Sequence, residues 1–261
     1  MRAILVRLLC VAIASTILAG SSCSSSNNGS GSSGAVTNAS ATGVWSGSDS
    51  ISGLGVTAVI DSGGQATFIR TDGVQFTGSV QVSGTTLAAQ VDGYSNFPAT
   101  FSDGSTYGIG TLDGTVTTGA TLTATLTFTT NKNTSIPGNW SLTFEAFSNN
   151  GSSTSDISAN YTDTATGAVL SITTTGVMSS QDPNTGCVLN GSVSTGDSTH
   201  AIYQVAYSYG SCTGNYAVLN GVQFTGLATL NSNVSPAQLT MAVTGASSSS
   251  KYALLSNLTG S

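Results

Sequence analysis

The stretch Thr121–Thr129, TLTATLTFT, alternates polar and apolar side chains without interruption. Threonine occupies every odd-numbered position, and the opposite face carries the apolar side chains of Leu122, Ala124, Leu126 and Phe128. A period of two residues is typical of a β-strand with one face buried and the other in water. The stretch therefore predicts a strand that covers a hydrophobic core.

The rest of the chain repeats this pattern in shorter pieces. Further strands are expected at residues 57–60, 66–70, 74–82, 86–91, 106–112, 140–146, 157–161, 168–172, 187–193, 203–209, 222–230 and 239–243. Asp-Gly dipeptides begin at residues 72, 92, 103 and 113 and Asn-Gly dipeptides at residues 150, 190 and 220, and we expect turns there. Helix is disfavoured, because the chain has 32 glycines and a single glutamate. We expect an all-β fold, an antiparallel meander that forms a β-barrel or a sandwich.

Three matches between the halves of the chain suggest an internal duplication. Residues 60–64 match 172–176, residues 73–80 match 186–193, and residues 108–112 match 226–230, at offsets of 112, 113 and 118. The order is kept and the offset drifts slowly, as changes in hairpin length would produce. The hexapeptide GVQFTG, at residues 73–78 and 221–226, breaks this order. Duplication predicts two lobes, residues 44–133 and 134–261, and the alternative is a chance match between Gly-, Ser- and Thr-rich strands.

Charged residues make up only 6% of the chain, and they are mainly acidic. Two of the five lysines and arginines, Arg2 and Arg7, lie at the start of the chain, so residues 23–261 have a formal charge of 3 − 11 = −8. An acidic surface repels the phosphates of nucleic acid, so we expect no nucleic-acid partner. The 39% of apolar residues and their alternation indicate a folded domain rather than a disordered chain.

Residues 1–22 have the features of an export signal. Arg2 and Arg7 precede an apolar run, Leu8–Ala19, that is too short to span a bilayer. Cys23 follows, and a Ser-, Gly- and Asn-rich segment is expected to form a flexible tether over residues 23–43. Two cleavage sites stay open, an ordinary one at Ala19-Gly20-Ser21 and one directly before Cys23.

The small residues, Cys23 and the tether together resemble a bacterial lipoprotein signal. The resemblance implies that the Cys23 thiol carries a diacylglycerol, that the membrane is a partner through this anchor, and that Ser24 directs the chain to the outer membrane of the cell envelope. Gly43–Gly47, GVWSG, resembles the Gly-x-Trp motif that opens lipocalin-like and surface-lipoprotein barrel units. Residues 186–229 resemble β-rich proteobacterial lipoproteins of unassigned function, and this resemblance supplies no active site.

The cysteine count is consistent with a lipidated Cys23. Cys10 lies in the export signal, so lipidation of Cys23 leaves Cys187 and Cys212 as a pair. Exported chains meet an oxidising compartment, and we expect a disulfide that closes a loop of 25 residues. The alternatives are a redox pair or a zinc site with His200, although a single histidine leaves zinc short of a fourth ligand.

Five aromatic side chains are candidates for a binding wall. Tyr203, Tyr207 and Tyr209 share one face of a predicted strand, and Trp45 and Trp140 each begin a predicted lobe. Such rings are core residues when buried, whereas open to solvent they stack on sugars or line a ligand cavity. Their exposure therefore decides between the two.

The sequence predicts no catalytic residue, no cofactor and no metal site. His200 has no nucleophile motif beside it, and Glu145 is the only glutamate available for acid–base chemistry. We expect a non-catalytic, lipid-anchored envelope protein whose β domain binds a ligand or protein partner at the membrane surface. The alternatives are a structural or adhesive surface protein, a transmembrane β-barrel and a hydrolase.

Overall fold

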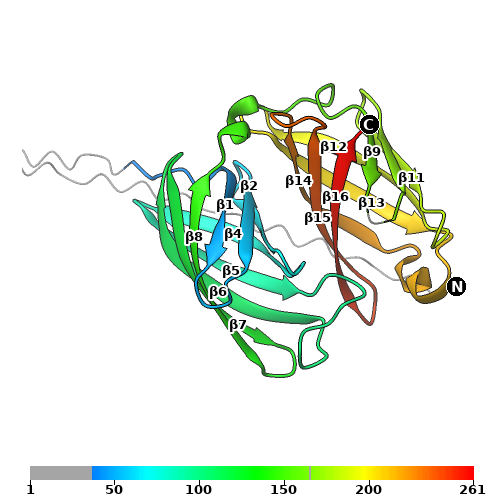
Figure 1. Cartoon of the computed structure of the whole chain (residues 1–261). Helices are drawn as coiled ribbons and strands as arrows, with labels where there is room; N and C mark the ends of the chain where they lie inside the picture. The colour runs from blue at the N-terminus through cyan, green and yellow to red at the C-terminus, as the bar shows by residue number, and fades with distance from the viewer. Residues whose placement is uncertain (1–36, 165) are drawn as a thin grey trace, which may run out of the picture. The chain divides into compact units, whose positions relative to one another are not determined.

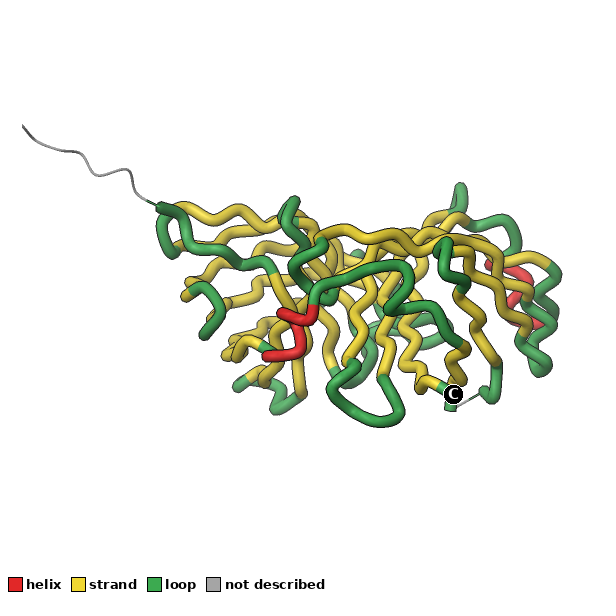
Figure 2. Tube along the Cα trace, turned by 90° about the horizontal axis from the view of Figure 1, so that it is seen from above, coloured by secondary structure: helices red, strands yellow, loops and turns green. Residues whose placement is uncertain are grey.

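The computed structural model describes residues 37–164 and 166–261. The predicted signal peptide (residues 1–22), Cys23 and the tether up to residue 36 lie outside the described residues. Strands dominate the fold, together with two short 3₁₀ helices among the described residues, η1 (Ala146–Asn150) and η2 (Gly214–Leu219) (Figure 2). The prediction of an all-β fold is confirmed.

The strands form two closed antiparallel barrels of eight strands, each in meander order (Figure 1). The first barrel contains β1 (Gly43–Asp49), β2 (Gly55–Ile60), β3 (Gln65–Arg70), β4 (Gln75–Ser83), β5 (Thr86–Tyr94), β6 (Tyr107–Thr117), β7 (Thr121–Thr130) and β8 (Ser135–Phe144). The second contains β9 (Asn160–Asp163), β10 (Val169–Ile172), β11 (Val177–Gln181), β12 (Val188–Asp197), β13 (Ile202–Gly210), β14 (Gln223–Asn231), β15 (Gln238–Ala246) and β16 (Lys251–Gly260). β1 pairs with β8 and β9 with β16. The predicted meander of two lobes is confirmed, and each lobe closes as a barrel rather than a sandwich.

The first barrel is filled by its own side chains. In β7, every second residue from Leu122 to Phe128 is buried and the intervening threonines are exposed, as the alternation predicts. The large rings of Trp45, Trp140 and Phe68 are at most 1% exposed. Burial of such apolar surface is the main stabilising contribution to a barrel of this kind.

The β5–β6 loop, residues 95–106, closes one end of the first barrel. Phe101 in this loop is 6% exposed, and its ring centre lies 5.5 Å from that of Phe128. The ring of Phe128 in turn packs edge-on against Phe76 at 5.2 Å. Three aromatic rings therefore fill this end of the barrel interior.

The predicted repeat joins equivalent strands of the two barrels. The matched residues fall at the β2–β3 and β10–β11 turns, in β4 and β12, and in β6 and β14. At the turns, Gly64 and Gly176 have φ of 82° and 80°, and each carbonyl accepts a 2.8 Å hydrogen bond from the N–H of Val80 or Val193. A Cβ at either glycine would come within 2.6 or 2.2 Å of the carbonyl oxygen of that valine. Both turns therefore require glycine. The repeated hexapeptide GVQFTG, by contrast, occurs at β4 and at β14, which are not equivalent strands of the two barrels.

The predicted boundary between residues 133 and 134 is too early. β8 pairs with β1 from Asp49↔Trp140 to Trp45↔Phe144, so the first barrel extends to Phe144 and the second begins at Asn160. Trp140 consequently belongs to the first barrel and does not begin the second lobe. Barrel closure joins strands that are distant in sequence, and local alternation carries no information about such pairs.

Candidate ligand cavity in the second barrel

One end of the second barrel contains a cavity of about 220 Å³. Its walls come from β9–β13, β15 and β16 and the loops at their ends, from η2 and from the β5–β6 loop. The apolar part of the lining consists mainly of Leu170, Leu189, Leu219, Met241, Leu254 and Leu258. Small-molecule sites are concave and combine apolar walls with polar groups that orient the ligand.

The cavity lies beside the shortest strands of the barrel. β9 and β10 have four residues each and β11 has five, whereas β12–β16 have nine or ten. β9 pairs with β16 only at Leu258, Thr259 and Gly260, so residues 251–257 of β16 extend beyond it. The barrel wall is therefore shortest at β9–β11. Side chains on the opposite wall have fewer side chains facing them across the barrel interior.

Polar side chains gather at this same end of the barrel. Asp163 ends β9, and Ser180 and Asp182 continue the inward face of β11. The Oδ1 atom of Asp182 accepts a 2.8 Å hydrogen bond from the backbone N–H of Asn184, and its Oδ2 atom accepts one of 2.8 Å from the hydroxyl of Thr185. The carboxylate is thus held in place, and each oxygen retains a lone pair for a further donor.

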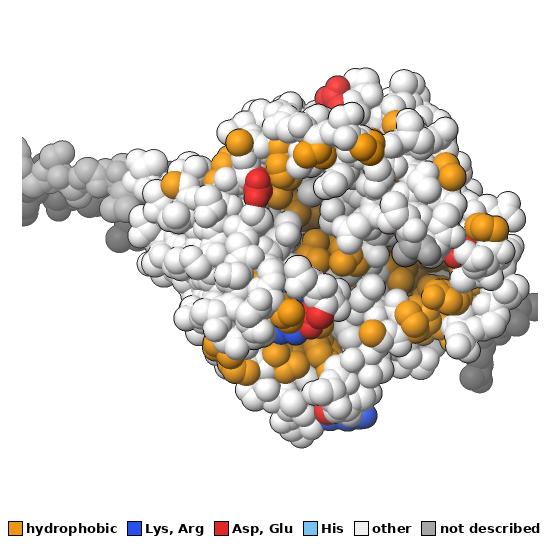
Figure 3. Space-filling model, in the orientation of Figure 1, with side chains coloured by type: hydrophobic (Ala, Val, Ile, Leu, Met, Phe, Trp, Pro, Cys, Tyr) orange, Lys and Arg blue, Asp and Glu red, His pale blue; other side chains and the backbone are white. Residues whose placement is uncertain are grey.

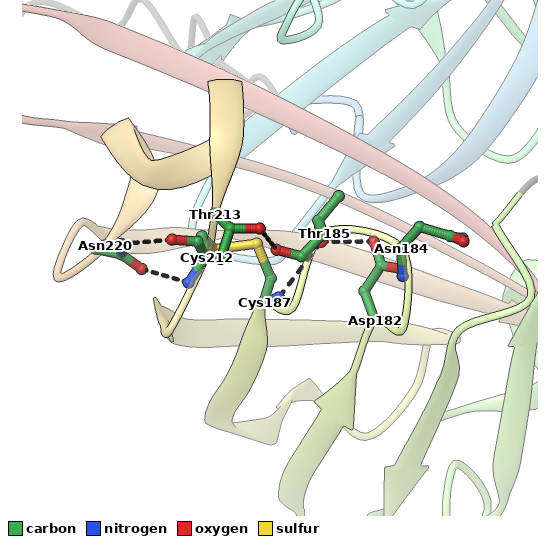
Figure 4. The surroundings of a disulfide bond; sticks show 7 residues. All are labelled: Asp182, Asn184, Thr185, Cys187, Cys212, Thr213 and Asn220. Atoms are coloured by element: carbon green, nitrogen blue, oxygen red, sulfur yellow. Dashed lines mark hydrogen bonds between the residues drawn. A yellow bond between two sulfur atoms is a disulfide. The ribbon is translucent and has the colours of Figure 1, made fainter.

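The predicted disulfide between Cys187 and Cys212 is confirmed (Figure 4), and Cys187 lines the cavity. The Asn220 side chain bonds both backbone groups of Cys212: its Oδ1 accepts from the N–H at 2.8 Å and its Nδ2 donates to the carbonyl at 3.0 Å. Thr213 donates its N–H and its hydroxyl to the carbonyl of Thr185 at 2.9 and 2.8 Å. These contacts fix both ends of the loop that carries η2.

Aromatic rings from two loops line the cavity. η2 supplies Tyr216, and the β5–β6 loop supplies Phe97, with ring centres 5.5 Å apart in an edge-to-face arrangement. Phe97 also packs edge-on against Tyr252 of β16 at 5.7 Å. Asn96 and Phe97 hydrogen-bond to the backbone of β16, which places this loop on the strand where β9 no longer pairs with it.

The five aromatic residues singled out from the sequence have different surroundings. Trp45, Trp140, Tyr203 and Tyr207 are at most 3% exposed and belong to the two cores. Tyr209 is half-buried and lines the cavity, with its ring centre 5.3 Å from that of Tyr207. Four of the five rings are therefore packing residues, and Tyr209 alone of the five lines the cavity.

The tyrosines of β13 are held in their neutral form. Burial raises the pKa of Tyr203 to about 12 and that of Tyr207 well above its ordinary value. Burial also raises the pKa of Tyr209, and the negative charges of Asp182 and Asp163 raise it further. The field of both carboxylates therefore reaches the aromatic wall of the cavity.

Sequence reasoning missed several residues of this site. Ser180 and Asp182 could have been predicted from the sequence. They follow Met178 at intervals of two residues, so strand alternation places them on the inward face, where polar side chains are unusual. Phe97 and Tyr216 carried none, since both lie in loops whose course depends on contacts with distant strands.

His200 lies in the β12–β13 turn. Its Nδ1 atom is 2.7 Å from Oδ2 of Asp197 and 3.0 Å from the hydroxyl of Thr199. Both contacts use one ring nitrogen, whereas a Ser-His-Asp relay uses Nδ1 for the acid and Nε2 for the nucleophile. The three residues stabilise a turn, and within residues 37–164 and 166–261 no three His, Cys, Asp or Glu side chains come together as a metal site.

The described part of the chain contains no helix of the length and apolar character needed to cross a membrane. Comparison of the chain with protein-family models, with curated proteins and with solved structures found no match.

Proposed function

We propose that the protein is a non-catalytic binding protein whose second barrel holds a small ligand in the cavity beside η2. The observation that carries this proposal is the contrast between the two barrel interiors. The first is closed by Phe101, whereas the second keeps about 220 Å³ open at the equivalent end. An open cavity lowers the packing energy of a core, so its presence favours a role in binding.

The size of the cavity limits the ligand. Sites for drug-sized molecules typically enclose roughly 300–1,000 Å³, so this cavity suits a smaller molecule or one end of a longer one. The apolar walls favour a hydrocarbon or aromatic body. The polar groups of Asp163, Ser180 and Asp182 favour a hydrogen-bonding or charged group at the end of that body.

Benzyl alcohol, a small ring with a hydroxyl group, is a suitable probe for this site. Met241 lines the cavity, and its methyl group can be observed by NMR in a chain labelled at methionine. We expect a saturable shift of the Met241 methyl signal. Absence of such a shift would contradict the proposal.

Two neighbouring serines provide matched variants. Ser180→Phe places a ring in the cavity and should abolish the shift, because Ser180 lines the cavity. Ser179→Phe places the same ring on the exposed outer face of β11 and should leave the shift unchanged. Equal effects of the two substitutions would show that the probe binds elsewhere.

We also propose that the protein is tethered to the outer membrane of the cell envelope through a lipid on Cys23. The lipoprotein-like signal, the flexible segment after it and the pairing of the other two mature cysteines support this anchor. Intact mass of the membrane-extracted protein tests it. We expect a chain that begins at Cys23 with added acyl mass, and a Cys23→Ala variant released from the membrane fraction; an unmodified chain in the membrane fraction would contradict the anchor.

A further inference from the structure

We infer that the cavity of the second barrel selects a small organic cation, an ammonium group on an apolar body. This inference rests on the proposed binding function and adds the chemical class of the ligand. Two kinds of side chain in the lining carry it: the carboxylates of Asp163 and Asp182, and the aromatic rings of Tyr209, Tyr216 and Phe97.

The two aspartates carry the only formal charges among the described residues that line the cavity. The lysines and arginines of the described chain make their contacts elsewhere. Arg70 pairs with Asp72, Lys132 donates to a backbone carbonyl of the first barrel, and Lys251 lies 3.5 Å from the ring centre of Tyr107. A cation that enters the cavity therefore meets two carboxylates and no competing cation of the protein.

The surface of the protein carries few charges, so the two carboxylates in the cavity stand out as a local concentration of negative charge. Charged side chains are few on the face shown in Figure 3. Two carboxylates in one concave site thus form a concentrated negative field, and low-dielectric walls strengthen such a field. The raised pKa of Tyr209, caused first by burial and then also by Asp182 and Asp163, is consistent with it.

The aromatic lining favours an organic cation over a metal ion or a hydrated inorganic cation. Tyr209, Tyr216 and Phe97 line the cavity, and aromatic rings attract an ammonium group through their quadrupole. The leucines and Met241 accommodate the apolar body. Carbonyl-rich or carboxylate-only sites, which bind hard metal ions, lack such walls.

Choline and its carbon isostere, 3,3-dimethylbutan-1-ol, form a matched pair of probes. They have the same shape and hydroxyl group and differ in the positive charge. We expect choline to shift the Met241 methyl signal at a concentration roughly tenfold lower than the neutral isostere, with ionic strength held constant. Raising the salt concentration should weaken choline binding and leave the isostere unchanged.

Variants that each remove one negative charge test whether the cavity carboxylates cause the preference for choline. Asp182→Asn and Asp163→Asn should each weaken choline binding by roughly fivefold or more and leave binding of the isostere unchanged. At residue 182, the Asn oxygen can accept from the Asn184 N–H and the Asn amide can donate to the Thr185 hydroxyl, so the turn is preserved. Asp113→Asn removes one charge from an exposed site on β6 and should leave choline binding unchanged.

The outcomes separate this inference from the proposed function. Equal binding of choline and its isostere, or binding of benzyl alcohol alone, would overturn the cation inference and leave the binding function in place. A loss of choline binding in Asp113→Asn as large as that in Asp182→Asn would also overturn it, since the effect would then be general charge. Failure of all three probes to shift the Met241 signal would overturn both.

Discussion

Removal of the Cys187–Cys212 disulfide is expected to destabilise the second barrel by about 3.5 kcal/mol. The two cysteines are separated by 25 residues in sequence. In the chain-entropy description, a cross-link lowers the entropy of the unfolded chain by 2.1 + 1.5R ln n, which for this loop is roughly 12 cal/mol/K, or about 3.5 kcal/mol at 25 °C. The cross-link spans the β12–β13 hairpin, so its loss acts on the unfolded chain and leaves every strand pair in place.

The double variant Cys187→Ala/Cys212→Ala tests this value with two optical signals. Both tryptophans, Trp45 and Trp140, lie in the core of the first barrel, whereas six of the eight tyrosines lie in the second. Urea unfolding monitored by tyrosine absorbance thus reports mainly on the second barrel, and tryptophan fluorescence reports on the first. With a urea m value of roughly 1–3 kcal/mol/M, the tyrosine midpoint should fall by roughly 1–3.5 M.

An unchanged tyrosine midpoint would refute the loop-closure reasoning. An equal fall of the tryptophan midpoint would show instead that the two barrels unfold together, coupled through the buried cluster of Val44, Val59, Ile202 and Leu227. A reducing agent serves as the control, because it should lower the tyrosine midpoint of the native protein and leave that of the double variant unchanged.

Three further changes give distinct signals. Phe101→Ala removes the ring that closes the first barrel and should lower the tryptophan-monitored free energy of unfolding by about 3–5 kcal/mol; a loss below about 1 kcal/mol would contradict the closing role. Gly176→Ala brings a Cβ to 2.2 Å from the carbonyl oxygen of Val193 at a φ of 80°, so urea unfolding should show a loss of about 1–3 kcal/mol, while Ser179→Ala in the same hairpin should show almost none. Burial raises the pKa of Asp49, but hydrogen bonds from the Asn139 backbone and neighbouring donors outweigh it and lower the pKa overall. Its stabilising contribution is therefore present above about pH 4 and is lost as the pH falls through the folded-state value, so Asp49→Asn should flatten the acid dependence of tryptophan-monitored stability; an unaltered pH profile would exclude this role.

Alternation predicted most strands, and β16 shows where it fails. The segment Lys251–Gly260, KYALLSNLTG, lacks a regular period of two, because the face opposite the core is also covered in part and only Lys251 and Asn257 are exposed. Leu254 and Leu258 pack on the core of the second barrel, while Ala253 on the opposite face is 0% exposed. A two-residue pattern develops only where one face meets water, so a strand covered on both sides carries no such signal.

Two of the Asp-Gly dipeptides that predicted turns lie inside strands instead. Asp92-Gly93 belongs to β5 and Asp113-Gly114 to β6. A Cβ at Gly93 would come within 2.2 Å of the Phe128 ring, and a Cβ at Gly114 would come within 1.9 Å of the carbonyl oxygen of Thr123. These glycines permit close packing and do not provide a positive φ, and the dipeptide alone does not distinguish the two uses.

Only the disulfide and the tyrosine row of the site could be predicted from the sequence. The cysteine count gave the disulfide, and the tyrosine row included Tyr209, which lines the cavity. Phe97 lies in the loop between β5 and β6. It precedes Asp163, the next residue of the cavity lining in sequence after this loop, by more than 60 positions. Such a contact depends on how the whole chain packs, and no local pattern encodes it.

The two barrels have equivalent strands but different interiors. We therefore attribute the cavity to a difference between their loops. By strand order, the β5–β6 loop corresponds to the β13–β14 loop. The first turns Phe101 inward onto Phe128, whereas the second is fixed at Cys212 and Asn220 and holds Tyr216 half-buried in the cavity wall.

If this fixation keeps the cavity open, the disulfide determines affinity as well as stability. Benzyl alcohol should then bind the folded Cys187→Ala/Cys212→Ala variant roughly tenfold more weakly, measured from the Met241 methyl shift in the absence of urea. An unchanged affinity would assign the open volume to the short strands β9–β11 alone, because those strands remain paired in the variant. The same substitution thus separates the part of the cavity that the barrel wall forms from the part that the loop forms.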